Sequence, residues 1–246
     1  SFHLGKLTTL QTMGRGLHTL SAHSSRSASN HLQGIAATVR LAKQWRVMAF
    51  ASYQAIDATL NDDGTARTLL YSGYHRTPTE IEKKHNTYET DLGASIGWHQ
   101  GTLHINANAV YTRYDRSLQP MQNALYHTYS AQGNSFLNMS MDYGWNNHRW
   151  AFSGETALNK KGAVVLIHTV NCRVTDQLSL MLLHRYYDKR YTAQHANSFR
   201  EGSSIQNEHG IYLGATWQPL RSWFVQGYVD YAHFSWPRYQ VSASSD

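Results

Sequence analysis

Apolar and polar residues alternate along most of the chain, most clearly between Tyr88 and Asp115. Leu92, Ala94, Ile96 and Trp98 occupy every second position, with small or polar residues between them. This period of two predicts a β-strand with one apolar and one polar face. The pair Gln100-Gly101 then separates this run from a second one, which extends from residue 103 to residue 112. Because glycine readily adopts the positive φ of a tight turn, we expect a long β-hairpin here.

The same hairpin pattern occurs five times. It predicts ten antiparallel strands, centred near residues 37, 50, 94, 108, 140, 153, 168, 184, 213 and 228. No linker rich in Pro, Gly or Ser divides the chain, so we expect residues 1–246 to form a single domain. The first and last residues suggest a fragment or a trimmed mature chain.

Short and long connections between the predicted strands alternate along the chain. The short ones lie near residues 43, 100, 146, 176 and 220, and the long ones at 57–87, 116–132 and 191–206. Residues 1–31 show little alternation and are predicted to be a loop or rim segment. Within 57–87, the run Thr77-Pro78-Thr79-Glu80 is typical of a helix start, so a short helix should begin at Pro78 and end near Lys84. Short connections at one end of the strands and long ones at the other are typical of outer-membrane barrels. On this interpretation, residues 57–87 would be a long extracellular loop.

Most tryptophans flank the short connections, and they share the apolar phase of their strands. We predict that they form a membrane girdle: Trp45, Trp98, Trp145, Trp150, Trp217 and Trp223. Tyrosines at the opposite strand ends, Tyr53, Tyr111, Tyr186 and Tyr231, would form a second belt. The predicted fold class is therefore all-β, an antiparallel up-and-down transmembrane β-barrel. His168, His184 and Arg113 also lie in the outward phase and do not fit it cleanly.

Composition does little to distinguish a membrane barrel from a soluble β-protein. The mean hydropathy is −0.53 and no apolar run has the ~20 residues that a transmembrane helix requires, but barrel strands need only ~10 alternating residues. The net charge of +6 comes from scattered basic residues, which is a weak signal for nucleic acid. The single Cys172 excludes an intramolecular disulfide, and we expect neither a metal site nor a cofactor. A soluble β-sandwich or barrel with the apolar phase inside remains an alternative.

Charged residues of both signs lie in the inward phase. A network of ion pairs is favoured over an active site because buried charges are generally paired. Asp142 and Glu155 lie on neighbouring strands, but counting from Asn146-Asn147 places them at unequal heights. We expect Arg76, in the loop 57–87, to fold over the barrel mouth and meet Glu155 or Glu208. The candidate lumen and gate residues are His75, Arg76, Glu155, Arg185, Glu208 and Asp230.

Several short motifs, in this order, carry a resemblance. They are His23-Ser24-Ser25-Arg26-Ser27 with Leu32-Gln33-Gly34, Gly73-Tyr74-His75-Arg76-Thr77-Pro78-Thr79-Glu80, Ser153-Gly154-Glu155-Thr156-Ala157, and Glu201-Gly202-Ser203 through Asn207-Glu208. From about residue 14 onwards the chain resembles the barrel region of Bacteroidota outer-membrane proteins that carry a competence-type helix-hairpin-helix domain. That resemblance implies a place in the bacterial outer membrane and a possible link to DNA uptake or binding. The helix-hairpin-helix module itself is not found in this sequence.

These observations predict a non-enzymatic outer-membrane β-barrel that acts as a passage, a binding protein or a scaffold, with outer-membrane lipid as its partner. The main alternative is a hydrolase built on such a barrel. A hydrolase would require an inward His and a carboxylate within hydrogen-bond reach at the extracellular rim.

Overall fold

The computed structural model describes residues 32–71, 75–123, 125–193, 205–220, 222–237 and 244–245. Over these ranges the protein is all-β, as predicted, with eleven strands in one sheet and two short helices. Among the described residues, no helix has the length and apolar character needed to cross a membrane. The predicted rim segment 1–31 lies outside the described residues.

Ten of the eleven strands lie where the alternation predicts them. The strands are β1 (Gly34–Arg40), β2 (Trp45–Leu60), β3 (Ala66–Leu70), β4 (Thr87–Gln100), β5 (Leu103–Leu118), β6 (Gly133–Asn146), β7 (Trp150–Asn159), β8 (Val164–Arg173), β9 (Leu178–Tyr187), β10 (Glu208–Leu220) and β11 (Trp223–His233). The helices are α2 (Pro78–Glu82) and the 3-10 helix η2 (Leu125–His127). The strand missing from the prediction is the short β3.

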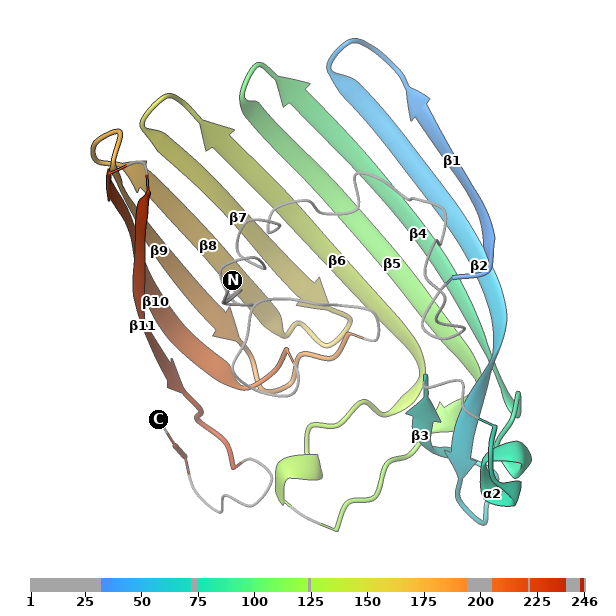
Figure 1. Cartoon of the computed structure of the whole chain (residues 1–246). Helices are drawn as coiled ribbons and strands as arrows, with labels where there is room; N and C mark the ends of the chain where they lie inside the picture. Colours follow the sequence, from blue (N-terminus) through green and yellow to red (C-terminus); the bar gives the residue numbers. More distant parts are fainter. Residues whose placement is uncertain are drawn as a thin grey trace.

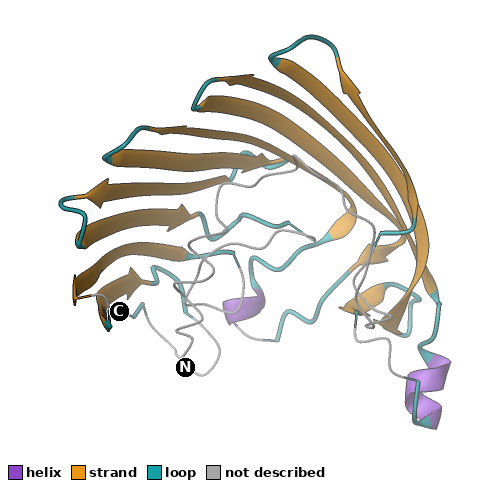
Figure 2. Cartoon of the chain, turned by 45° about the horizontal axis from the view of Figure 1, so that its top comes forward, coloured by secondary structure: helices purple, strands orange, loops and turns teal. Residues whose placement is uncertain are grey.

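The long strands pair in chain order, each antiparallel to the next, from β1 through β2 and β4 to β11. The sheet curves strongly, so that it has a convex and a concave face (Figures 1 and 2). Among the described strands, β1 pairs only with β2, and β11 only with β10. The five connections that join β1 to β2, β4 to β5, β6 to β7, β8 to β9 and β10 to β11 are short and lie at the upper end of Figure 1.

The opposite end of the sheet carries an extension that was predicted to be a loop. Strand β2 continues to Leu60, and a turn at Asn61 with Gly64 at φ +80° leads into β3. Asp63 stabilises this turn, because its carboxylate accepts hydrogen bonds from the amide and the hydroxyl of Thr65. The loop predicted at 57–87 is therefore shorter than expected. The predicted start of α2 is confirmed, with Thr77 as its N-cap in a complete capping box.

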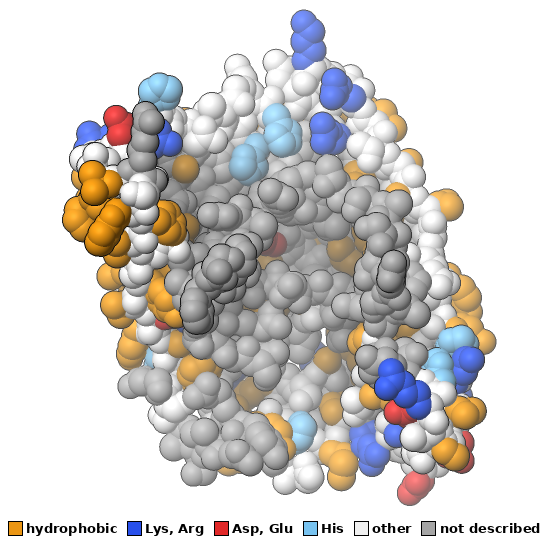
Figure 3. Space-filling view, in the orientation of Figure 1, with side chains coloured by type: hydrophobic (Ala, Val, Ile, Leu, Met, Phe, Trp, Pro, Cys, Tyr) orange, Lys and Arg blue, Asp and Glu red, His pale blue; other side chains and the backbone are white. Residues whose placement is uncertain are grey.

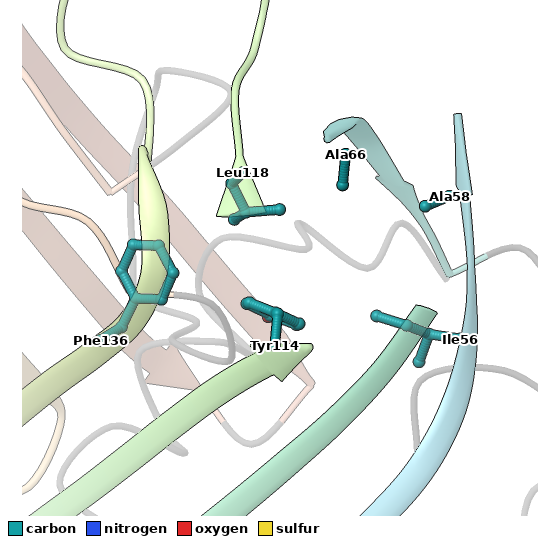
Figure 4. Packing of buried hydrophobic residues seen from close by; sticks show 6 residues of the cluster. All are labelled: Ile56, Ala58, Ala66, Tyr114, Leu118 and Phe136. Atoms are coloured by element: carbon teal, nitrogen blue, oxygen red, sulfur yellow. The ribbon is translucent and has the colours of Figure 1, made fainter. Parts of the chain in front are cut away.

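An apolar cluster fills the concave side at this extended end. Tyr114 of β5 and Ile56 of β2 are buried in it, and β3 covers them through Ala66 (Figure 4). The other members are Ala58, Leu118 and Phe136. A strand of five residues forms few backbone hydrogen bonds, so packing in this apolar cluster helps to hold β3 on the sheet.

The two faces of the sheet have opposite character. Large apolar side chains on the convex face are exposed, whereas polar side chains on the concave face, such as Asn106 and Asn108, are buried. In Figure 3, hydrophobic side chains lie along both outer margins, and Lys and Arg side chains lie mainly at the two ends of the sheet. The concave face is not uniformly polar, since Ile167, Leu183 and Tyr212 form a further buried apolar cluster there. The many exposed large apolar side chains of the convex face are what differs most from a soluble β-sandwich, which buries such residues.

Candidate functional site in the polar interior

The strongest ion-pair cluster of the concave face joins β9, β10 and β11. Arg185 of β9 is fully buried, and its Nε donates a short hydrogen bond to Glu208 of β10. Its Nη1 donates to Asp230 of β11, with 2.8 Å between Nη1 and Oδ1. One guanidinium thus ties three neighbouring strands together.

Glycine on the neighbouring strand makes room for this arginine. Gly210 is the direct cross-strand partner of Arg185, and a β-carbon at Gly210 would lie 2.5 Å from the guanidinium carbon. The guanidinium therefore lies flat against the backbone of β10. The same arrangement of a large side chain over an inward glycine recurs with Phe50 over Gly93, Asn106 over Gly97, His104 over Gly144 and Tyr212 over Gly214.

A second polar cluster surrounds Asp142 of β6. Its carboxylate accepts hydrogen bonds from the side-chain amides of Asn106, at 2.7 Å, and Asn108, at 2.9 Å, both of β5. His104 Nε2 lies 4.0 Å from Oδ1 of the same carboxylate. Asp142 is almost completely buried, so these donors replace the water that a carboxylate would otherwise bind.

Asp142 and Glu155 are direct cross-strand partners, so the prediction that they lie at unequal heights is wrong. The turn between β6 and β7 is not centred on Asn146-Asn147. Instead, the side chain of Asn147 accepts hydrogen bonds from the amides of Arg149 and Trp150, which lengthens the turn and shifts the register. Two carboxylates therefore stand side by side on the concave face.

A third cluster lies towards the extended end, around Glu89 of β4. Gln54 of β2 donates to Oε1 of Glu89 at 2.7 Å, and the hydroxyl of Tyr71 donates to Oε2 at 3.0 Å. The Tyr71 hydroxyl also lies 3.3 Å from that of Tyr114. In the same region, Thr112 donates to Asp91 at 2.6 Å. The hydrogen bonds described for Glu89, Asp91 and Asp142 come from neutral side chains, whereas Arg185 forms ion pairs of the kind predicted for the interior.

His75 lies apart from these clusters, in the connection before α2. Its Nε2 is 2.7 Å from Oδ2 of Asp57, and the other oxygen of Asp57 accepts a hydrogen bond from the amide of His85. The two histidine rings meet edge to face. This is a His–carboxylate pair at the extended end, but Asp57 shares the phase of Tyr53 and not that of the inward Gln54. It is therefore not the inward pair that a hydrolase was expected to require.

The expected gate does not lie where the sequence placed it. Figures 1 and 2 show α2 beyond the ends of β2 and β4, at the margin of the sheet and not across the concave side. The amide of Arg76 donates to the side chain of Glu80 within the capping box. Glu208, one of the two predicted partners of Arg76, pairs with Arg185 instead. The hydrogen bonds from the amides of Arg76 and Thr77 lower the pKa of Glu80 below its ordinary value.

The predicted girdle lies at the end with short connections. Trp45 and Trp98 are direct cross-strand partners, and Trp150 stacks on Phe152 beside Trp145. Trp98 is half-buried, and the others are exposed: Trp45, Trp145, Trp150, Trp217 and Trp223. At the opposite end, Tyr53 stacks on Tyr88 with nearly parallel rings.

Three segments meet at the end with long connections. The ammonium of Lys189, after β9, lies over the rings of Tyr129 and Trp236, and the Trp236 indole donates to the carbonyl of Leu125 at 2.9 Å. Nearby, hydrogen bonds from Arg190 lower the pKa of Asp188. These contacts tie the chain around residues 125–129 to the segments at 188–190 and 234–237.

Tyr191 follows directly after this group of contacts. It packs into an apolar cluster with Ala157, Val165 and Tyr187, and burial raises its pKa to about 12. The connection after β9 is therefore anchored to the sheet over at least this part of its length.

One feature was missed in the sequence. Outward-facing His168, His184 and His209 come from three consecutive strands, and they form a contact row with Tyr143. The available signal was that His168 and His184 interrupt the apolar phase of their strands. Among the described residues, no group of three or more His, Cys, Asp or Glu side chains could hold a metal ion.

Comparisons of the chain with protein-family models, with curated proteins and with solved structures found no match.

Proposed function

We propose that this chain is a β-barrel protein of the bacterial outer membrane, with its convex face in contact with lipid. The observation that carries this proposal is the inverted burial pattern. Leu213 and Val229 are exposed at the middle of neighbouring strands, whereas Arg185, Glu208 and Asp142 are buried on the concave face. Apolar side chains between two aromatic belts match a lipid-facing barrel wall, and charges inside match its polar lumen.

This proposal places a requirement on the sheet edges. The hydrocarbon core of a membrane offers no water to hydrogen-bond free backbone groups, so open edges are excluded there. The outer edges of β1 and β11 must therefore be paired in the membrane. Slow amide exchange at β1 in lipid vesicles would support this, whereas exchange at the rate of free amides would contradict it.

Within the membrane, the protein is a non-enzymatic passage for small hydrophilic solutes. Polar groups line much of its concave wall, and the cluster of Arg185, Glu208 and Asp230 lies against that wall. The role in DNA binding or uptake that the resemblance implies stays a prediction, because it depends on a helix-hairpin-helix module that this sequence does not contain.

Conductance in planar bilayers tests the passage. We expect stepwise ion conductance that increases when Arg185, Glu208 and Asp230 are all replaced by Ala, because the triple change shortens three side chains that line the lumen and leaves neither carboxylate behind without Arg185. Replacement by Ala of Arg190, which is exposed, and of Asp188, its half-buried partner, is the control and should leave the conductance unchanged. No conductance in either the natural protein or the triple variant would exclude a passage.

The hydrolase is retained as a second candidate because of one observation, the 2.7 Å contact between His75 and Asp57. Such a pair can activate a nucleophile or a water molecule. However, the ring next to His75 belongs to another histidine, His85, and not to a nucleophile. Hydrolysis of ester or peptide substrates that His75→Ala abolishes, while the protein stays folded, would favour the hydrolase over the passage.

A further inference from the structure

A row of polar aromatic side chains crosses the otherwise apolar convex face from β6 to β10. The hydroxyl of Tyr143 lies 2.6 Å from Nε2 of His168. The His168 ring is parallel to that of His184, with 6.3 Å between ring centroids. His184 then faces His209, with 3.1 Å between their two Nε2 atoms. This row is unusual, because the surrounding outward positions of these strands are occupied by residues such as Leu166, Leu182 and Ile211.

The backbone of β7 is shaped to permit the first contact of the row. Tyr143 and His168 lie on opposite sides of β7, and Gly154 is the residue between them. A β-carbon at Gly154 would lie 2.6 Å from Tyr143 and 2.8 Å from His168. The glycine thus lets the tyrosine hydroxyl reach the histidine. With its Nε2 occupied in this way, His168 supports the ring of His184 by stacking.

The last two histidines have the geometry of a metal-binding pair. Metal–nitrogen bonds to histidine are about 2.0–2.1 Å long, so nitrogen atoms 3.1 Å apart can both bind one ion at an N–metal–N angle of about 100°. We propose that Nε2 of His184 and Nε2 of His209 together bind one divalent transition-metal ion of the Cu²⁺, Ni²⁺ and Zn²⁺ class. Imidazole is a preferred ligand for these ions. Water completes the coordination, since the protein supplies two ligands.

Binding requires a change of tautomer but no net loss of protons from neutral rings. In the metal-free pair, one histidine donates its Nε2 proton to the other. When the ion binds, that proton moves to Nδ1 of the donor ring, so that both Nε2 lone pairs face the metal. Protonation of either ring blocks the site, because a protonated imidazole has no free lone pair on Nε2 for the metal.

The pair lies where water can reach it. His209 is exposed, it is the second residue of β10, and its direct cross-strand partner is Tyr186, one of the tyrosines at the ends with long connections. In a lipid-embedded protein this position is the edge of the apolar band. The metal site goes beyond the proposed passage, and the two can fail separately, because metal binding can be measured whether or not ions are conducted.

Titration of the folded protein with Cu²⁺ in detergent micelles, followed by electron paramagnetic resonance, tests the proposal. We expect one bound Cu²⁺ whose spectrum shows two imidazole nitrogens. His184→Gln and His209→Gln should each weaken binding at least about tenfold, since each leaves a single protein ligand. Glutamine keeps the size and polarity needed for folding, which circular dichroism checks. His148→Gln is the matched control, because His148 is exposed in the β6–β7 turn and should bind as the natural protein does.

Two results would overturn the proposal. One is a spectrum with a single nitrogen ligand, or with none, in the natural protein. The other is an affinity that neither His184→Gln nor His209→Gln reduces relative to His148→Gln. Either result would leave the 3.1 Å contact as a hydrogen bond only.

Discussion

Arg185 lies flat against the backbone of Gly210, with its guanidinium carbon 2.5 Å from the place that a β-carbon of residue 210 would occupy. Gly210→Ala should therefore push the arginine away from Glu208 and Asp230. We expect a loss of about 1–3 kcal/mol in the free energy of unfolding, as is typical of overpacked interiors. Unfolding of the protein by guanidinium chloride in lipid vesicles measures this free energy.

Gly227→Ala on the neighbouring strand β11 is the matched control. A β-carbon at Gly227 would meet nothing within 4 Å, so this change should have almost no effect on stability. Equal losses in the two variants would show that the close contact of Arg185 with β10 is not what Gly210 provides.

Removal of the arginine itself should cost more. Arg185→Met removes the guanidinium that pairs with Glu208 and Asp230, and breaking a buried ion pair in this way costs about 3–5 kcal/mol. Arg190→Met removes a surface pair with Asp188 and should cost at most about 1 kcal/mol. The comparison uses the same unfolding titration, and similar losses for both variants would contradict a stabilising role of the interior cluster.

Contact of the convex face with lipid can be tested by placing an arginine either in the middle or at the end of a strand. Leu213 and Leu220 are both exposed residues of β10, at 54% and 62%, but Leu213 lies mid-strand and Leu220 is the last residue. In lipid, Leu213→Arg should cost about 2–4 kcal/mol and Leu220→Arg about 0–1 kcal/mol. In water both exposed sites would tolerate arginine. Equal and small effects would therefore count against a lipid-facing surface.

The start of α2 should depend on pH. The carboxylate of Glu80 accepts hydrogen bonds from the amides of Arg76 and Thr77, and the first of these lowers its pKa most. A lowered carboxyl pKa means that the capping box is intact above the ordinary value of 4.5 and is lost as the pH falls through the lower folded value. The amide chemical shifts of both residues, measured by NMR, should move only in that acidic range. Glu80→Gln should remove the dependence, and a transition well above pH 4.5 would contradict the assignment to Glu80.

The positions of the strands could be predicted from the sequence because an alternation of two residues maps directly onto two faces of a sheet. The same reasoning missed β3, because Asn61 and Gly64 were interpreted as part of a loop and not as a tight turn between paired strands. Single turns also decide which residues face each other. One side chain, Asn147, shifts the register that brings Asp142 opposite Glu155.

The contacts of the candidate sites were harder to predict for a related reason. Arg185 meets residues on two further strands, and His184 meets His209 along a diagonal, with Ile211 as its direct cross-strand partner. Such contacts depend on the stagger between strands and on glycines that leave space, neither of which the alternation specifies. The inward phase of Arg185, Glu208 and Asp230 could be predicted, but not their convergence.

Quenching of tryptophan fluorescence by brominated lipids tests the central claim, that the convex face contacts the membrane, most directly. Most of the seven tryptophans lie in the girdle at the end with short connections. In vesicles, bromine near the lipid headgroups should quench most of the emission, and bromine near the chain ends should quench less, because tryptophan belts lie at the interface. Emission that is the same with brominated and unbrominated lipids would show that these tryptophans do not touch lipid, and it would contradict the proposed outer-membrane barrel.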